Sequence, residues 1–581
     1  MIRSRGSNDD AAMMAPTTPV NIIEVLDSVR DRYANRVALQ EFGEGGLRTM
    51  TYEELARQRS RLSAFLMERG VERCDRVAIL SEGRMIWGAA FFGVIEVGAI
   101  IVPLDIKLKE PEFVNILNHA EAKALLVSGK FEAVAERLKA HVPSLSHVLS
   151  LEERSERWTA LGQLPPGSRA TSRRSVTDED TALIVYTSGT TGTPKGVEIT
   201  CGNLRFEVTS FEHVISYRDD DQFLSILPVN HLFEITGGFL GPLYYGCTIT
   251  YCQSLKPTEL LRAMQRTGTT VMLVVPLIVK MLHEGLFRKI ETLPSNQRAV
   301  FRWLLALAKR CDQVGLPLGR WVFARIRKQF GRLRAFVCGG APLDPALARD
   351  FSALGLTILQ GYGLTETAPV ITCNTLQMNR IGSVGRPLPG VDIKILRENP
   401  NAADGEIITR GPNVMRGYYR NPEATAEVLR DGWFSTGDLG YLDSEGFLFI
   451  SGRKKSLIVT GGGKKVQPEE IEELLGRSSF IKEACVFGKP ATEGLKAGTE
   501  EVYAVLVPNE DQFKTTNTPF DDATIKRVLA EELASLGKGL AEYKRPVGFD
   551  ISKEELPKTA TRKVKRVDVR KRVLEASRGG A

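Results

Sequence analysis

From about Pro19 onward, short apolar runs alternate along the chain with longer segments that have a helical pattern of apolar and polar residues. The helical segments include residues 52–69 and 85–97. The apolar runs predict strands at residues 76–80, 99–103, 122–127, 181–186, 223–227, 248–251 and 271–275. Strands that alternate with helices favour doubly wound, largely parallel sheets. Residues 1–18 precede this pattern, and we expect them to be a disordered tail.

The pattern changes after about Ser383. Short strands at 391–396, 406–410 and 446–450 are separated by Gly, Pro and Asn, as in a small barrel or meander. From Lys455 onward a shorter α+β pattern follows. Its strands are predicted at 457–459, 483–487 and 501–508, and its helices at 468–477 and 522–537.

This change in texture suggests a domain boundary near 453–455. We predict an α/β fold with a large N-terminal domain, residues 19–453, of two doubly wound sheets and a small β-barrel-like subdomain. A smaller, mobile α+β C-terminal lid domain, residues 454–581, is expected to follow.

The composition is that of an ordinary globular protein, with 43% hydrophobic and 25% charged residues in 581. The eight cysteines are scattered without a CxxC pair, which argues against a disulfide scaffold or zinc cluster and favours a reducing, cytoplasmic compartment. The most apolar run, residues 86–103, is interrupted by Glu96 and by glycines. We interpret it as a buried helix that leads into a buried strand, and we expect no transmembrane segment.

Basic residues concentrate in residues 285–334, which hold twelve of them against Glu291 and Asp312, in a chain of net charge +7. Such local basicity indicates a surface feature rather than a binder of long polyanions. The stretch lacks aromatic residues interleaved on strands, so no nucleic-acid partner is expected.

The segment Tyr186-Thr-Ser-Gly-Thr-Thr-Gly-Thr-Pro-Lys-Gly196 follows a predicted strand and is rich in glycine and hydroxyl residues before Lys195. A loop with so many N–H and O–H donors can wrap a phosphate chain, and the lysine adds a positive charge. Pro194 and the glycine after the lysine distinguish it from the common G-x-x-x-x-G-K-[ST] loop. The candidate phosphate-binding residues are Thr187, Ser188, Gly189, Thr190, Thr191, Gly192 and Lys195.

The segment YTSGTTGTPKGV resembles the signature of the adenylate-forming superfamily, which comprises acyl-CoA synthetases, adenylation domains of peptide synthetases and firefly-type luciferases. Further segments of this chain are similar to the remaining family motifs and stand in the same order, from 181 to 563. The resemblance implies the use of ATP and Mg²⁺, and an acyl-adenylate intermediate.

Residues 361–367, Gly-Tyr-Gly-Leu-Thr-Glu-Thr, resemble the second core motif of the family. The resemblance implies that Thr365 contacts the α-phosphate and that Glu366 ligates Mg²⁺, a cation that requires hard oxygen ligands. Gly361, Tyr362 and Gly363 belong to the same nucleotide-binding turn. Upstream, Gly339, Gly340 and Ala341 lack bulk, so a flat adenine could lie against their backbone.

By the same resemblance, Asp438 and Arg453 contact the ribose, and Lys563 is the catalytic lysine of the C-terminal motif. Most relatives have Gly before that lysine, whereas this chain has Arg562. Lys455 matches a hinge at which the C-terminal domain rotates between the two half-reactions. The residues expected to line the pantetheine tunnel of coenzyme A are Gly461, Gly462, Gly463 and Lys464.

Two segments bear on the acid. Residues 228–234, PVNHLFE, resemble a loop beside the acyl pocket of long-chain acyl-CoA synthetases, in which His231 would gate the carboxylate entrance. Residues 285–334 resemble an insertion of the long-chain group. The spacing of Val322, Ile326, Gln329 and Phe330 predicts an amphipathic basic helix there. It either contacts an anionic membrane peripherally or packs on its own domain.

The sequence therefore predicts a ligase closest to bacterial long-chain fatty acyl-CoA synthetases, acting on a medium- or long-chain fatty acid with coenzyme A. An acyl carrier protein is the alternative acceptor, and an aryl or other bulky acid is the alternative substrate. A luciferase-like oxidation of the adenylate has no support beyond the shared family. A catalytically inactive binding module is disfavoured, because Lys563, Glu366 and Asp438 are all present.

Overall fold

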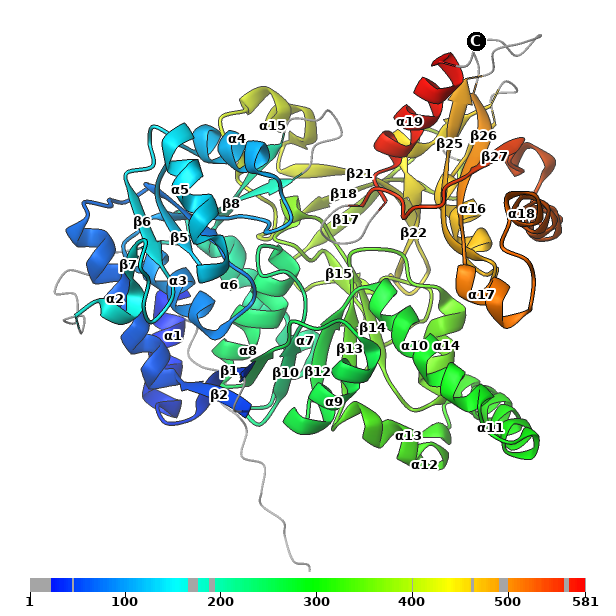
Figure 1. Cartoon of the computed structure of the whole chain (residues 1–581), viewed down its shortest axis with the longest axis horizontal. Helices are drawn as coiled ribbons and strands as arrows, with labels where there is room; N and C mark the ends of the chain where they lie inside the picture. The colour runs from blue at the N-terminus through cyan, green and yellow to red at the C-terminus, as the bar shows by residue number, and fades with distance from the viewer. Residues whose placement is uncertain are drawn as a thin grey trace, which may run out of the picture.

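The computed structural model describes residues 22–43, 46–165, 176–187, 194–399, 401–460, 464–490, 500–558 and 564–579. These residues form two large sheets with helices on their faces, then an antiparallel sheet, then a smaller α+β unit (Figure 1). In Figure 1 the blue to green segments make up the larger body, and the orange and red segments of the C-terminal unit lie at the upper right.

The first sheet has nine strands in the order β16-β15-β14-β13-β12-β10-β11-β1-β2. The six strands from β14 to β1 run parallel, and the outermost pairs are antiparallel. The strands are Val37–Gly43 (β1), Gly46–Thr51 (β2), Gln222–Ser225 (β10), Thr248–Tyr251 (β11), Val271–Val274 (β12), Ala335–Cys338 (β13), Ile358–Tyr362 (β14), Thr372–Cys373 (β15) and Arg386–Pro387 (β16).

The second sheet has eight strands in the order β19-β9-β8-β4-β3-β5-β6-β7. The strands are Arg76–Leu80 (β3), Ile100–Pro103 (β4), Ala122–Val127 (β5), His147–Ser150 (β6), Thr159–Ala160 (β7), Thr181–Thr187 (β8), Lys195–Thr200 (β9) and Gly417–Tyr418 (β19). All run parallel except β9, which forms a hairpin with β8 and also pairs antiparallel with β19. The predicted architecture of parallel α/β sheets is confirmed.

Neighbouring residues on the strands face different apolar layers, because side chains alternate between the two faces of a sheet. Leu273 of the first sheet and Val77 of the second lie in one core together with α2, α3 and α6. Met272 instead contacts the layer of α9, α10 and α14, and Leu80 contacts that of α4 and α5. The helices are Ile22–Tyr33 (α1), Tyr52–Glu68 (α2), Met85–Glu96 (α3), Glu110–Ala120 (α4), Glu132–His141 (α5), Cys201–Ser210 (α6), Glu212–Ile215 (α7), Gly241–Tyr244 (α8), Pro257–Thr267 (α9), Pro276–Glu291 (α10) and Pro345–Ala353 (α14).

Helix α3 is buried along almost its whole length, as its apolar sequence predicts. Its one acidic residue, Glu96, lies 3.3 Å from the Nε atom of Arg59 on α2, and the same guanidinium donates a hydrogen bond to Asp27 on α1. A buried carboxylate requires such a partner. The contacts of the Arg59 guanidinium therefore link α1, α2 and α3. Within the described chain, no helix combines the length and the apolar character needed to cross a bilayer.

The sequence after β16 forms a five-stranded antiparallel sheet with helix α15 (Pro422–Val428) and then the C-terminal unit. The strands of the sheet are Asp392–Leu396 (β17), Gly405–Arg410 (β18), Leu429–Arg430 (β20), Trp433–Leu442 (β21) and Leu448–Arg453 (β22). The C-terminal unit contains Ile458–Val459 (β23), Lys465–Val466 (β24), Pro468–Leu475 (α16), Ile481–Pro490 (β25), Glu500–Pro508 (β26), Glu510–Thr515 (α17), Asp522–Gly537 (α18), Gly548–Ile551 (β27) and Arg566–Gly579 (α19). The domain boundary near 453–455 remains a prediction.

The basic stretch 285–334 differs from the prediction of one amphipathic helix around Ile326. Its main helix is α11 (Ser295–Gln313), followed by three short turns, Gly319–Val322 (α12), Ala324–Arg327 (α13) and Lys328–Phe330 (η4). The predicted continuous helix is wrong because the backbone leaves α-helical geometry at Phe323, with φ −100° and ψ 25°, and the last turn is a 3₁₀ turn. The exposed apolar side chains of the stretch lie mainly on α11 and α12.

Candidate active site

The predicted phosphate-binding loop closes the β8–β9 hairpin. Thr187 and Lys195 are directly opposite each other at the ends of the two strands. The predicted residues between them, Ser188, Gly189, Thr190, Thr191 and Gly192, lie outside the described residues. The hairpin register therefore places the lysine at one end of the loop and a threonine at the other.

Lys195 and Glu366 are joined through Tyr418, a residue that the sequence analysis missed. The Lys195 ammonium lies 4.8 Å from the centroid of the Tyr418 ring, and the Tyr418 hydroxyl donates a 2.9 Å hydrogen bond to Glu366 Oε1. Pairing of β19 with β9 holds this tyrosine opposite Val197. Burial raises the pKa of Tyr418, and the neighbouring carboxylate raises it further. The phenol therefore stays protonated and remains a donor.

Glu366 and Thr365 lie in a single turn of 3₁₀ helix, Thr365–Thr367 (η5), just past the end of β14. The Glu366 carbonyl accepts a hydrogen bond from the Met415 amide. The turn requires Gly363, because a Cβ there would lie 1.8 Å from the Pro369 carbonyl oxygen. Gly361 is also confined, since its Cβ would lie 3.1 Å from Cys373 Sγ. The glycines of this motif thus let two chain segments pass close to each other.

The two predicted ribose contacts are brought together by strand pairing. Asp438 on β21 is opposite Arg453 on β22, and the Arg453 Nε atom lies 2.9 Å from Asp438 Oδ1. The Tyr362 hydroxyl donates to Asp438 Oδ2 at 2.8 Å. Asp438 is 4% exposed, and Gly437 before it has a φ of +71°, with open space where a Cβ would lie. Each carboxylate oxygen can accept a second hydrogen bond, so two ribose hydroxyls could still be bound.

The predicted adenine turn follows β13 directly. Gly339 donates its amide hydrogen to the Val274 carbonyl, and Gly340 has a φ of +86°, which favours glycine. A Cβ at Gly339 would lie 3.3 Å from the ring of Phe233. Gly340 is exposed and Ala341 is half-buried. The turn that is predicted to hold adenine therefore contacts the 228–234 segment.

His231 is half-buried in the loop after β10, and its carbonyl accepts hydrogen bonds from Glu234 and Ile235. The following segment is a π-helix, Glu234–Leu240 (η3), a form that often occurs at functional sites. The Glu234 side chain is buried and accepts a 2.5 Å hydrogen bond from Ser225. Burial raises the pKa of Glu234 to about 7.

The residues predicted in the C-terminal unit are only partly described. Lys563 and the tunnel residues Gly461, Gly462 and Gly463 lie outside the described residues. Lys464 is exposed, and its carbonyl accepts a hydrogen bond from Thr460. The backbone of Lys455 lies in a 3₁₀ turn, Lys454–Ser456 (η6).

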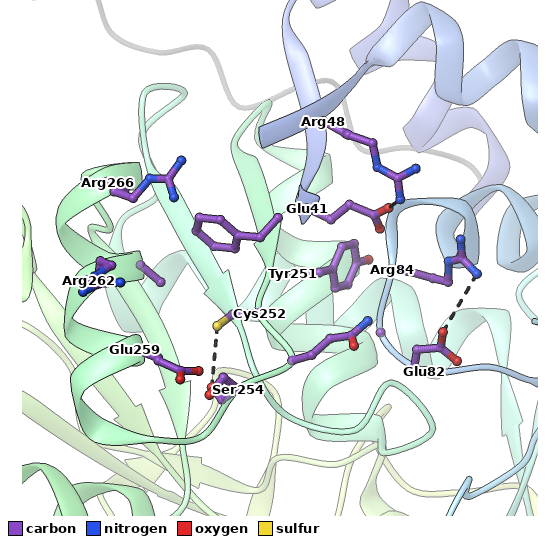
Figure 2. Close-up of a pocket in the computed structure, with 14 residues that line it drawn as sticks. Glu41, Arg48, Glu82, Arg84, Tyr251, Cys252, Ser254, Glu259, Arg262 and Arg266 are labelled. Atoms are coloured by element: carbon purple, nitrogen blue, oxygen red, sulfur yellow. Dashed lines mark hydrogen bonds and ion pairs between the residues drawn. The ribbon is translucent and has the colours of Figure 1, made fainter. Parts of the chain in front are cut away.

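An open cavity of about 450 Å³ lies at the carboxyl ends of β1 and β11 (Figure 2). Seven of its fourteen lining residues are charged. Arg262 and Arg266 come from α9, and Glu41 and Arg48 come from the β1–β2 hairpin. It contains none of the predicted site residues. It borders the predicted acyl loop, however, because Gly83 in its wall lies next to Val229.

Within the described part of the chain, no group of three or more His, Cys, Asp or Glu side chains could hold a metal ion by itself. The Glu366 carboxylate offers hard oxygen atoms, one of which accepts the hydrogen bond from Tyr418. Mg²⁺ commonly binds one or two carboxylates together with substrate phosphates. The residues present thus fit Mg²⁺ that arrives with ATP.

The model of the AMP-binding enzyme family matches residues 26–419, and the model of the AMP-binding enzyme C-terminal domain matches residues 470–563. The long-chain-fatty-acid–CoA ligase FadD15 of Mycobacterium bovis is 32% identical over 564 residues, which cover 91% of this chain and 92% of that protein. The chloroplastic long-chain-fatty-acid–[acyl-carrier-protein] ligase AEE15 of Arabidopsis thaliana is 26% identical over 92% of this chain and 82% of its own length. The crystal structure of ATP-bound MatB from Rhodopseudomonas palustris is 26% identical, has a TM-score of 0.75, and covers 95% of this chain and 99% of its own.

The fold and the site define an adenylate-forming ligase. The chain belongs to the AMP-binding enzyme family. This confirms the family resemblance found in the sequence. The expected cofactors ATP, Mg²⁺ and coenzyme A are those of adenylate-forming acid–CoA ligases.

Replacement of Tyr418 by phenylalanine tests the link between Lys195 and Glu366. Phenylalanine keeps the ring under the ammonium group but removes the hydrogen bond to Glu366. We expect acid-dependent pyrophosphate–ATP exchange to fall about 10- to 100-fold, because a hydrogen bond to a charged group is worth about 1.5–3 kcal/mol. Tyr419→Phe, which changes the adjacent tyrosine, is the control and should exchange at the wild-type rate. Equal rates for both variants would contradict a role for the Tyr418 hydroxyl.

The buried Glu234 predicts a dependence of stability on pH. Its folded-state pKa of about 7 exceeds the ordinary value of 4.5, so the folded protein keeps a proton that the unfolded chain releases. The free energy of unfolding should therefore fall as pH rises from 4.5 to about 7, by an amount on the order of 3 kcal/mol, and stay lower above that range.

Glu234→Gln remains neutral at every pH and can still accept the hydrogen bond from Ser225. The melting temperature of this variant should equal that of the wild type near pH 4.5. It should exceed the wild-type melting temperature above about pH 7. The exposed Glu542→Gln variant should follow the wild-type profile. Parallel curves for Glu234→Gln and wild type would show that Glu234 carries no such proton.

Proposed function

We propose that the chain is a fatty acid–CoA ligase that acts on medium- or long-chain acids. The observation that supports this most directly is the 32% identity to a long-chain-fatty-acid–CoA ligase across 91% of the chain. The basic insertion at 285–334 adds to it, because it resembles an insertion of the long-chain group. A second candidate is acyl transfer to an acyl carrier protein, which the similarity to AEE15 favours. Aryl or other bulky acids remain the third alternative.

In the proposed first step, an oxygen of the acid attacks the α-phosphorus of ATP and pyrophosphate leaves. This chemistry needs positioning and charge neutralisation more than covalent help from the protein. Lys195 and the Thr187–Gly192 loop would bind the phosphates, and Thr365 would contact the α-phosphate. Glu366 would hold Mg²⁺, which neutralises phosphate charge. Lys563 would contribute the second positive charge at the reacting groups.

The nucleoside would be held by residues from three segments. Asp438 and Arg453 would bind the ribose, and the Gly339–Ala341 turn would face adenine. Gly361, Tyr362 and Gly363 would shape the same wall, in which Tyr362 orients the Asp438 carboxylate through the 2.8 Å hydrogen bond. His231 would gate the entry of the acid next to this turn.

In the second step, the thiol sulfur attacks the acyl carbonyl and AMP leaves. We propose that rotation at Lys455 withdraws Lys563 before this step. The residues that would line the thiol entrance are Gly461, Gly462, Gly463 and Lys464. Glycines leave room for a narrow tunnel, since they have no side chain.

We further propose that the insertion docks on an anionic membrane surface, from which fatty acids are taken up. The α11–α12 surface, as we call it, exposes Val300, Trp303, Val314, Leu316 and Trp321, with Trp321 82% and Trp303 65% exposed. The same stretch also carries exposed basic residues, namely Arg302, Arg310, Arg320, Arg325 and Lys328. In Figure 1, α11 projects from the body of the molecule. Tryptophan beside basic residues suits the interface of a bilayer.

The substrate prediction is tested by pyrophosphate release with a graded series of saturated acids from butanoate to octadecanoate, and with cinnamate as an aryl acid. We expect a maximum at medium or long chains and faster turnover when coenzyme A is added. An optimum with cinnamate would contradict the fatty acid assignment. Turnover that responds to acyl carrier protein but not to coenzyme A would favour the second candidate.

The membrane prediction is tested by flotation with vesicles of anionic or zwitterionic lipid. Binding should require anionic lipid and weaken with salt, because each basic residue near such a surface contributes about 1 kcal/mol. The double variant Trp303→Ala/Trp321→Ala should bind about tenfold more weakly, since it buries less apolar area. Tyr543→Ala, an exposed aromatic residue elsewhere, is the control. Membrane docking would be contradicted if the double variant and Tyr543→Ala floated equally well. It would also be contradicted if the protein bound an acidic carrier protein but not vesicles.

A further inference from the structure

The guanidinium group of Arg566 joins three side chains of the C-terminal unit. Its Nη1 atom donates to Ser456 Oγ at 2.9 Å and to Glu469 Oε1 at 2.8 Å. Its Nη2 atom donates to Glu472 Oε2 at 2.7 Å. Ser456 belongs to the η6 turn, and both glutamates belong to α16. One planar group therefore ties the start of α19 to two separate elements.

These contacts connect two positions to which the proposed function assigns roles. Ser456 immediately follows the proposed hinge residue Lys455, and Arg566 comes three residues after the proposed catalytic Lys563. On the described side of that lysine, Val564 forms a β-bridge with Lys558, and the Lys565 amide donates to the Pro557 carbonyl at 2.7 Å. Both described ends of the segment that carries Lys563 are thus fixed at one place.

The partners of Arg566 are themselves anchored. Glu472 accepts a 2.7 Å hydrogen bond from the Val486 amide of β25 through its other oxygen. Burial raises the pKa of Glu472 to about 7, although Arg566 opposes this shift. Lys558, across the bridge, donates to Glu483 Oε1 at 2.5 Å. Only arginine presents several donors in a fixed plane, so a lysine could keep the charge but not all three directions.

We propose that Arg566 is a positioning residue for adenylation, which holds the start of α19, three residues after Lys563, against the hinge turn and α16. This inference rests on the proposed roles of Lys563 and Lys455. Arg566 itself touches no substrate. It makes the hinge turn, α16 and the start of α19 move as one body, so that a rotation at the hinge also moves the point at which the chain leaves Lys563.

The test measures the two half-reactions separately, with full-length protein. Acid-dependent pyrophosphate–ATP exchange reports adenylation, and transfer from a preformed acyl-adenylate to coenzyme A reports thioester formation. We expect Arg566→Ala to slow exchange about 100-fold and Arg566→Lys about tenfold, since small misplacements of a reacting group have effects of this size. Transfer should change less than about threefold, because Lys563 has left the site by then. Ser456→Ala, which removes only the hinge contact, should slow exchange and spare transfer as well.

Two further variants calibrate these results. Arg572→Ala lies on the same helix at an exposed position, and it should leave both half-reactions unchanged. Lys563→Ala should abolish most exchange. If Lys563→Ala exchanged normally, the proposed function of that lysine would be refuted, irrespective of Arg566.

A purely structural role for Arg566 predicts a different pattern, in which both half-reactions decline together with the melting temperature. If Lys563→Ala is inactive in exchange while Arg566→Lys and Ser456→Ala match Arg572→Ala, the positioning role is overturned. Arg566→Lys keeps the charge beside the two glutamates and should melt near the wild-type temperature. It therefore decides the question even if Arg566→Ala does not fold.

Discussion

The neutral side chain of Tyr418 between Lys195 and Glu366 is the interaction on which the rest of the candidate site depends. A direct contact between ammonium and carboxylate would leave each charge neutralised by the other. Instead, the ammonium lies over the face of the ring and the carboxylate accepts from the hydroxyl. Each charge thus has a partner that fixes its position and leaves it available. A site that binds a polyphosphate and a divalent cation together needs both an available positive charge and an available carboxylate.

The two predicted ribose contacts are arranged differently from Lys195 and Glu366. Asp438 and Arg453 do meet directly, because the register of β21 and β22 places them opposite each other. Tyr362 takes the second oxygen of Asp438, so the carboxylate cannot rotate. Arg453 is the last residue of β22, two positions before the proposed hinge. A rotation that starts at Lys455 would therefore leave the nucleoside contacts in place on the larger body while the Arg566-anchored unit moves.

The parallel strands and most residues of the candidate site could be predicted, because local patterns in the sequence indicate both. Apolar runs located β3, β5, β8, β11 and β12, and the Gly-rich motifs located Glu366 and Asp438. Tyr418 was not predicted, because its place beside Lys195 depends on the pairing of β19 with β9, more than two hundred residues earlier in the chain. The continuous helix predicted around 322–330 was wrong for a different reason. The spacing of apolar residues stays helical through this stretch, so it cannot show that the backbone leaves α-helical geometry at Phe323.

The contact between Phe233 and Gly339 shows how recognition of the acid and of the nucleotide can be coupled. Gly339 directly follows β13 at the carboxyl edge of the first sheet, where ligands of open α/β sheets bind. Its missing side chain admits the Phe233 ring on one side and, in the proposed function, adenine near the other. Any side chain at 339 would have to displace one of these neighbours, since the ring already lies 3.3 Å from the Cβ position. The 228–234 loop and the adenine turn therefore cannot shift independently. In the proposed function, occupancy of the nucleotide site would therefore constrain the loop beside which the acid would enter.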